Sequence, residues 1–358
     1  MQIIGQNEQK QQQRRKVQKP VSYTHLDVYK RQPHNSQRGE NSDVITVENY
    51  AAMRSNLVQQ VDRHAEQVSM VTYSYAGDVE QDLQRALDYI QSSYPMGAYA
   101  LEDATYEIVQ VASFYQLQLQ LTYSHSAWEM EQITQVRMEN LENTIGEAIT
   151  AGRGRQTLMI SGFSNVDFAA LCRSYLLEHP DQVLQLPQVS GTCWPETGSV
   201  RVVELRYAYP VAAAQLRQMR SQVEAQLQAA AALAGSSEQE TAALLYQFLQ
   251  AQYTGAQQDP QTPAYSVLCQ GQGDAASFAA VYRLLCQQAG LSCMLVEGEN
   301  DGTAYTWNIL QLDGVYYHAD LLRSLQAGLT QLPLRGDAAM TGYSWDSERY
   351  PVCPQDAP

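Results

Sequence analysis

Side chains capable of nucleophilic catalysis occur in the last third of the sequence. Cys269 lies just ahead of two glycines, Gly271 and Gly273, and His318 and Asp320 follow in a later segment. A thiol, an imidazole and a carboxylate are the groups that thiol enzymes use as nucleophile, base and orienting acid. Their chemistry therefore depends on whether the elements between them bring the three groups together.

Local pattern predicts those elements. A helix is expected between the glycines and Gly290, followed by a strand over 293–298. The dipeptide Asp313-Gly314 is typical of a hairpin turn, and it joins strands that include 305–309 and 315–320. The apolar side of the helix consists of Phe278, Val281, Tyr282 and Leu285. The segment is thus a helix packed beside an antiparallel hairpin.

The same segment resembles the transglutaminase-like core of the papain-like cysteine-enzyme superfamily. That family has a Gly-rich loop, a nucleophilic Cys at a helix start, an aromatic-Ala pair, a strand, His-Ala-Trp-Asn, an Asp-Gly turn and Trp-Tyr-His-Val-Asp. This chain has Phe278-Ala279, Trp307-Asn308, the Asp313-Gly314 turn and His318-Ala319-Asp320 in that order and at matching spacings. The resemblance covers about residues 237–345 and implies a helix-plus-antiparallel-sheet domain.

Two of the three catalytic positions implied by the resemblance are changed. Ala275 stands at the nucleophile position and Tyr305 at the base position, and only the acid is kept, as Asp320. A methyl group cannot attack a carbonyl, and a phenol with a pKa near 10 is a poor base at neutral pH. Loss of the nucleophile alone costs about 10⁶ in kcat in a comparable triad. We therefore expect no thiol catalysis by the family route, and a structural hydrogen bond between Tyr305 and Asp320.

The expected function is binding or scaffolding by a domain that has lost its catalytic groups. In that interpretation Tyr305, Asp320, Trp307 and Asn308 are offered to an extended peptide or a cell-envelope component. Asp274 and Ser277 flank the vacant nucleophile position at the helix start and complete the expected cleft.

Two alternatives remain open. The first is an active thiol acyltransferase or cysteine protease that uses Cys269 with His318. Cys269 lies ahead of the helix rather than on it, so the helix dipole would not favour its thiolate. The second is an architectural domain whose cleft is filled by its own side chains.

Residues before this segment are interpreted as two tandem α+β repeats. Strict alternation from Tyr115 to Tyr123 predicts a half-buried antiparallel strand, and a continuous helix is expected over 127–149. The same order of strand and helix recurs before a long helix that begins after Pro210. The expected division is a disordered or artefactual N-terminal segment at 1–42, repeats at 43–141 and 142–235, a transglutaminase-like domain at 236–345, and a C-terminal tail at 346–358.

Composition limits the classes of partner. The chain has 358 residues, a net charge of −15 and 44% hydrophobic residues. The acidic charge argues against nucleic acid as a partner, because phosphate binding depends on Lys and Arg. No apolar run is long enough for a transmembrane helix. No Cys or His cluster has metal-ligand spacing, so neither a metal nor a cofactor is expected.

The N-terminus differs from the rest of the chain. All four lysines lie within residues 1–32, and the sequence at 21–32 resembles the translation of two head-to-head sequencing adapters. We therefore exclude it from the fold. The acidic, lysine-free remainder and the usual settings of such domains suggest an extracellular or cell-surface protein of a bacterium.

Overall fold

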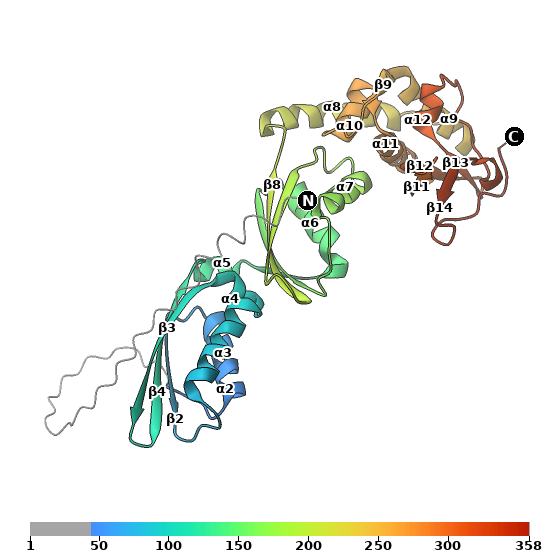
Figure 1. The fold of residues 1–358 in the computed structure, drawn as a ribbon. Coiled ribbons are helices and arrows are strands. Elements are labelled where there is room, and N and C mark those ends of the chain that lie inside the picture. Colours follow the sequence, from blue (N-terminus) through green and yellow to red (C-terminus); the bar gives the residue numbers. More distant parts are fainter. Residues whose placement is uncertain (1–43, 358) are drawn as a thin grey trace. The chain divides into compact units, whose positions relative to one another are not determined.

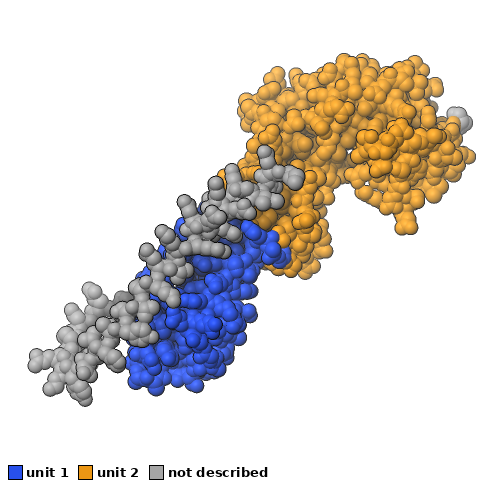
Figure 2. Space-filling view, in the orientation of Figure 1, with its two compact units in different colours: residues 1–133, 194–198 blue, residues 134–193, 199–358 orange. Residues whose placement is uncertain are grey.

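The computed structural model describes residues 44–357, which divide into two compact units (Figure 2). One unit contains the described residues up to 133 together with 194–198, and the other contains 134–193 and the residues from 199 onward. The interpretation of segment 1–42 lies outside the described residues. Within residues 44–357, none of the helices has the length and apolarity needed to cross a membrane.

The first unit is a four-stranded sheet covered on one face by helices (Figure 1). Its elements are β1 (Ile45–Thr46), α2 (Tyr50–Asp62), β2 (Gln67–Thr72), α3 (Val79–Ser92), α4 (Pro95–Ala100), β3 (Leu101–Val111), β4 (Phe114–Tyr123) and α5 (Ala127–Glu131). The strand order is β1-β2-β4-β3, with β4 antiparallel to both β2 and β3. The alternation expected over 115–123 is confirmed, since the leucines of β4 are buried and its glutamines are exposed.

The second unit begins with a sheet of the same strand order. Its elements are β5 (Thr134–Arg137), a 3₁₀ turn at Met138–Asn140, α6 (Leu141–Thr150), β6 (Arg155–Ser161), α7 (Phe168–Glu178), β7 (Gln188–Trp194) and β8 (Val200–Ala208). They form the sheet β5-β6-β8-β7, in which β5 is parallel to β6. Equal strand order is what a tandem repeat requires, and the repeat itself stays a prediction.

The helix expected over 127–149 is wrong. It is interrupted by β5, which pairs with Leu158–Ser161 of β6. The β-branched residues Thr134 and Val136 suit a strand, and Val136 is buried in this sheet's core as it would have been in the helix. The second sheet therefore starts at Thr134 rather than after 141.

The remaining elements form a helical layer on a third four-stranded sheet, which is antiparallel. They are α8 (Ala213–Ala231), α9 (Glu238–Gln252), β9 (Gly255–Ala256), α10 (Pro263–Tyr265), a π-helical turn at Ser266–Gln270, β10 (Gln272–Gly273), α11 (Ala275–Gln288), β11 (Ser292–Asn300), β12 (Thr303–Leu312), β13 (Val315–Ala319), α12 (Leu321–Gln326), a 3₁₀ turn at Asp337–Ala339 and β14 (Tyr343–Trp345). The sheet order is β13-β12-β11-β14. The α+β class and the helix-plus-antiparallel-sheet arrangement are confirmed.

The two faces of this sheet contact different parts of the chain. Leu310, Leu312 and Ala319 pack with α9 and α11 in one core. Trp307 and Ile309 point to the other face, because side chains alternate along a strand, and they pack with residues from 340 to 353. The segment 346–358, expected to be a tail, thus contributes the buried Tyr350 and Cys353 to this second core.

Candidate functional site

The start of α11 is the position that the resemblance assigns to a nucleophile. Asp274 is its N-cap and accepts hydrogen bonds from the backbone N–H of Ser277 at 2.8 Å and from its hydroxyl at 2.5 Å. Gly271 precedes it with φ of 70°, and a Cβ at this glycine would lie 1.7 Å from the carbonyl oxygen of Gln252. The tight turn therefore places Ala275 in the first turn of the helix. Its methyl group cannot act as a nucleophile.

An arginine from α7 covers this helix start. Nη2 of Arg173 lies 2.6 Å from Oδ2 of Asp274, and its Nη1 lies 3.4 Å from Oδ1 of Asp259. The Asp274 carboxylate is thus shared between the helix cap and an ion pair. Arg173 was missed by sequence reasoning, because nothing local links it to a residue about a hundred positions away.

A second arginine fixes the same two helices together. Arg283 of α11 is buried and donates to the Glu178 carboxylate and to the carbonyl oxygens of Leu177 and Glu178, the latter two at 3.0 and 2.7 Å. The last carbonyls of α7 lack partners within their own helix, so Arg283 satisfies them. The helix that would carry the nucleophile is therefore held against the second α+β sheet domain.

The hairpin forms as predicted and carries the retained acid. Asp313 and Gly314 both have positive φ, 50° and 82°, as a type I′ turn requires. Tyr305 donates from its hydroxyl to Oδ1 of Asp320 at 3.1 Å, which is the contact expected from the sequence. Asp320 also caps α12 by accepting from the N–H of Arg323 at 3.1 Å.

A third partner of Asp320 comes from the C-terminal strand. The hydroxyl of Tyr343 in β14 donates to Oδ2 of Asp320 at 2.5 Å and accepts from Arg323 Nη1 at 3.2 Å. Burial and the Asp320 carboxylate raise the pKa of Tyr343 to about 12, and they raise the pKa of Tyr305 further. Both phenols are therefore neutral donors at physiological pH, and neither is a base.

His318 does not face the thiol proposed as its alternative partner. It is fully buried, its Nδ1 lies 2.9 Å from Trp307 Nε1, and its Nε2 lies 2.9 Å from Asp337 Oδ1. An indole N–H can only donate, so Nδ1 accepts and Nε2 carries the proton given to Asp337. Cys269 is in the π-helical turn, packs against the other core and has a pKa raised by burial. The structure does not bring Cys269 and His318 together.

His318, Asp337 and Cys353 are the group of described residues that could hold a metal ion. Their candidate ligand atoms lie within 4.8 Å of one another. However, Nε2 of His318 has no free lone pair, because its neutral tautomer is set by Trp307. Metal-bound histidines normally donate from their other nitrogen to an acceptor, and here the neighbour is a donor. The group is a hydrogen-bonded cluster that ties the C-terminal segment to β13.

Three side chains predicted to line a cleft are buried instead. Trp307, Asn308 and Ser277 each have 0% exposure, so the expectation that they are offered to a ligand is wrong. Asn308 donates to the carbonyl oxygens of Ala279 in α11 and Met294 in β11, joining helix to sheet. Ala275 packs with the first core and Tyr305 with the second, and the hydrogen bonds and ion pairs of the described residues do not connect them.

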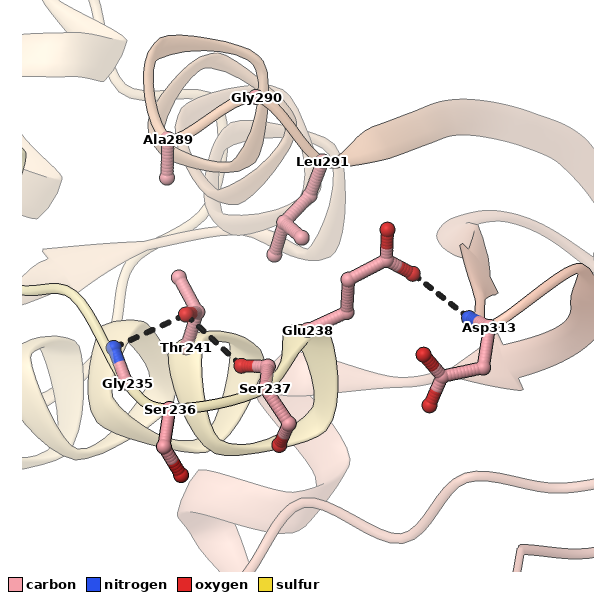
Figure 3. Close-up of a pocket in the computed structure, with 9 residues that line it drawn as sticks. All are labelled: Gly235, Ser236, Ser237, Glu238, Thr241, Ala289, Gly290, Leu291 and Asp313. Atoms are coloured by element: carbon pink, nitrogen blue, oxygen red, sulfur yellow. Dashed lines mark hydrogen bonds between the residues drawn. The ribbon is translucent and has the colours of Figure 1, made fainter.

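A pocket of about 510 Å³ lies elsewhere, at the start of α9 (Figure 3). It is lined by the segment 235–238, Thr241, the end of α11 and Asp313, and contains none of the sequence-predicted site residues. Glu238 accepts from the Asp313 N–H at 2.6 Å, and Thr241 bonds Gly235 and Ser237. These polar groups are hydrogen-bonded to one another, and they stabilise the start of α9.

The sequence matches no protein-family model, and the comparison with curated proteins gave no match. Among solved structures, a TGase is 11% identical, with 56% of this chain and 59% of that chain covered and a TM-score of 0.25. A proposed protease from Parabacteroides distasonis is 11% identical over 70% and 39%, with a TM-score of 0.23, and a proposed cysteine protease from Cytophaga hutchinsonii is 8% identical over 46% and 69%, with a TM-score of 0.25. The chain thus spans less than two thirds of the first two.

Proposed function

We propose that residues 236–345 form a non-catalytic transglutaminase-like module that acts as a scaffold for the preceding α+β domain. The observation that carries this proposal is the start of α11, where Ala275 stands at the nucleophile position and Arg173 pairs with Asp274 beside it. A thiol enzyme needs a thiolate at such a helix start and an imidazole within reach. Ala275 supplies no thiol, and Tyr305, at the base position, donates its proton to Asp320 in a hydrogen bond.

The state of the cysteines supports the same proposal. All six cysteines are free thiols, and burial raises the pKa of five of them: Cys172, Cys193, Cys269, Cys293 and Cys353. A raised pKa lowers the thiolate fraction at neutral pH, and the thiolate is the nucleophile. The proposed alternative with Cys269 and His318 would have to break the Trp307–His318–Asp337 hydrogen bonds first.

Burial of two of the four side chains expected to bind a ligand limits the binding role predicted from the sequence. Trp307 and Asn308 have no surface to offer, while Tyr305 and Asp320 are engaged with each other and with Tyr343. These contacts support the architectural alternative, in which side chains of the domain itself fill the expected cleft. Binding of an extended peptide or a cell-envelope component would need a surface outside this cleft.

A turnover assay tests the proposal. The full chain is incubated with a glutamine-containing peptide and a primary amine, and separately with a peptide substrate for proteolysis, with and without iodoacetamide. We expect no thiol-dependent turnover and no difference between the native chain and Cys269→Ser. Turnover that iodoacetamide blocks and Cys269→Ser abolishes would overturn the proposal.

A further inference from the structure

The edge strand β3 of the first sheet is unusually open. It runs for 11 residues, from Leu101 to Val111, and pairs only with β4 among the described strands. Its last residues include apolar side chains on the surface, with Val109 43% and Val111 38% exposed. Long, exposed edges with free N–H and C=O groups are templates for pairing with another strand.

Several devices that normally protect an edge are missing from β3, whose charged side chains are all acidic: Glu102, Asp103 and Glu107. The strand contains neither proline nor lysine, and its one irregularity lies at its beginning, between Leu101 and Asp103. The opposite edge of the same sheet, β1, has only two residues. In the second sheet, the equivalent edge strand β7 has seven residues, with Gly191 at its centre, which weakens a strand. Strand β1 is thus protected by its short length and β7 by a central glycine, whereas β3 has neither feature.

We propose that β3 is a docking surface for a second copy of this chain, which adds its own β3 antiparallel across a two-fold axis. Such an axis is perpendicular to the sheet, so residues on one face of the first copy lie beside residues on the same face of the second copy. Ala104, Tyr106 and Ile108 all lie on the helix-covered face. Antiparallel pairing centred on Tyr106 therefore sets Ala104 of each copy beside Ile108 of the other and continues the apolar layer.

Charge selects this register over its neighbours. Centred on Tyr106, the pairing places Asp103 opposite Val109 and Thr105 opposite Glu107, so acids do not face each other. A shift of one residue in one direction sets Asp103 opposite Glu107, and a shift in the other sets Glu107 opposite its own copy. Like charges directly opposite in a sheet are destabilising, so the strand is complementary to itself in a single full register.

The experiment measures self-association by sedimentation velocity over a concentration series of the full chain. The native chain is expected to dimerise reversibly, and Val109→Glu is expected to raise the dimer dissociation constant roughly two- to thirtyfold, since it sets two acid pairs face to face. Val109→Lys faces Asp103 with the opposite charge and should retain or tighten the dimer. Adding Asp103→Lys to Val109→Glu should restore it.

Gln116→Glu is the matched control. It places the same charge on the same sheet face one strand further in, opposite Val109 on β4, and should leave the dimer unchanged. Circular dichroism melting verifies that each variant folds, and the exposed positions make this the expected result. A chain that stays monomeric at all concentrations overturns the proposal. So does a dimer that is insensitive to Val109→Glu or is weakened equally by Val109→Lys.

Discussion

Nη2 of Arg173 lies 2.6 Å from Oδ2 of Asp274, so an arginine of α7 pairs with the N-cap residue of α11. In a thiol enzyme this place must stay open, because the substrate carbonyl approaches the nucleophile here. Arg173 and Asp274 are 30% and 13% exposed, and the ion pair engages the same carboxylate that caps α11. The ion pair and the alanine at position 275 therefore both support the proposal that this helix start is not a catalytic site.

Arg283 is the stronger test of the contact between α7 and α11. Arg283→Met removes hydrogen bonds to the Glu178 carboxylate and to two carbonyl oxygens at the end of α7. We expect the free energy of unfolding to fall by about 2 kcal/mol, because two carbonyl groups at the end of α7 and the Glu178 carboxylate lose the charged donor of a buried side chain. Urea denaturation followed by tryptophan fluorescence measures the change.

Arg349→Met is the control for Arg283. Its partner Glu297 lies 3.0 Å away, and both side chains are more than half exposed, 61% and 57%. Exposed pairs contribute about 0 to 1 kcal/mol, so this variant should be close to the native chain. Equal losses from the two arginine variants would contradict a structural role for the buried contact.

Ala275→Cys should create a thiol that is more acidic than Cys269. Backbone N–H groups at a helix start and a nearby guanidinium both favour the thiolate, and Arg173 is held beside Asp274. We expect the introduced thiol to be alkylated by iodoacetamide at pH 7 several-fold faster than Cys269, whose pKa is raised by burial. Mass spectrometry of the labelled peptides gives both rates in one sample.

Arg173→Met in the same background separates the two causes. Loss of the guanidinium should slow alkylation of the introduced thiol and leave the rate at Cys269 unchanged. An introduced thiol that reacts no faster than Cys269, with or without Arg173, would show that the helix start does not favour an anion.

Local pattern predicted the elements of the C-terminal domain well, because each has a short-range signal. Asp313-Gly314 requires the turn conformation it adopts, and Asp274 and the glycines before it mark the start of α11. The helix at 127–149 failed because Val136 suits the core side of either a helix or a strand, and pairing with β6 decides between them. Apolar periodicity thus predicted that Val136 is buried, but not whether it lies in a helix or a strand.

The surroundings of the candidate site could not be predicted in this way. Trp307 was assigned to a cleft because Trp307-Asn308 matches the family's Trp-Asn pair, yet residues from 340 to 353, a segment without a strong pattern, pack over it. Asp337 contacts His318 from 19 positions later in the chain, and Tyr343 contacts Asp320 from 23 positions later. The backbone N–H of Cys353 in turn donates to Asp337, 16 positions before it. Long-range packing of this kind leaves no periodic signal in the sequence.

Acid should destabilise the C-terminal domain through His318. Desolvation lowers the pKa of His318 below 6.5, and the Asp337 carboxylate only partly opposes this. A histidine whose pKa is lower in the folded state binds its proton more readily when unfolded. The contribution of the neutral His318 ring to the free energy of unfolding is therefore complete above pH 6.5. It is lost as the pH falls from 6.5 toward the pKa of His318 in the folded chain.

Chemical denaturation at a series of pH values tests the role of His318. The slope of unfolding free energy against pH between 6.5 and 5 should be smaller in His318→Gln than in the native chain, whatever the variant's overall stability. Identical slopes would mean that the ring does not control this acid dependence.

Zinc should not stabilise the native chain, although His318, Asp337 and Cys353 lie close together. The Trp307 N–H occupies Nδ1 of His318 and keeps the proton on Nε2, the nitrogen that faces the other two groups. Trp307→Phe removes that donor and frees the ring to move its proton to Nδ1. Thermal melts with and without Zn²⁺ should show no shift for the native chain and a rise in Tm for the variant. A zinc-dependent rise in the native chain would contradict the tautomer assigned here.

Alkali should weaken the contact between β14 and the end of β13 through Tyr343. Its pKa is raised to about 12 by burial and by Asp320, so the unfolded chain loses this proton more readily than the folded one. The stability it contributes is complete below about pH 10 and is lost as the pH rises through 12. Tyr343→Phe keeps the ring on Trp307, at a centroid distance of 5.3 Å, and removes only the hydroxyl. We expect the free energy of unfolding to fall by about 1 to 2 kcal/mol at neutral pH and to decline less steeply above pH 10, as measured by urea denaturation.

Tyr73→Phe is the control, because the Tyr73 side chain is 66% exposed. It should match the native chain both at neutral pH and above pH 10. An unchanged alkaline slope in Tyr343→Phe would show that this hydroxyl does not hold β14 in place.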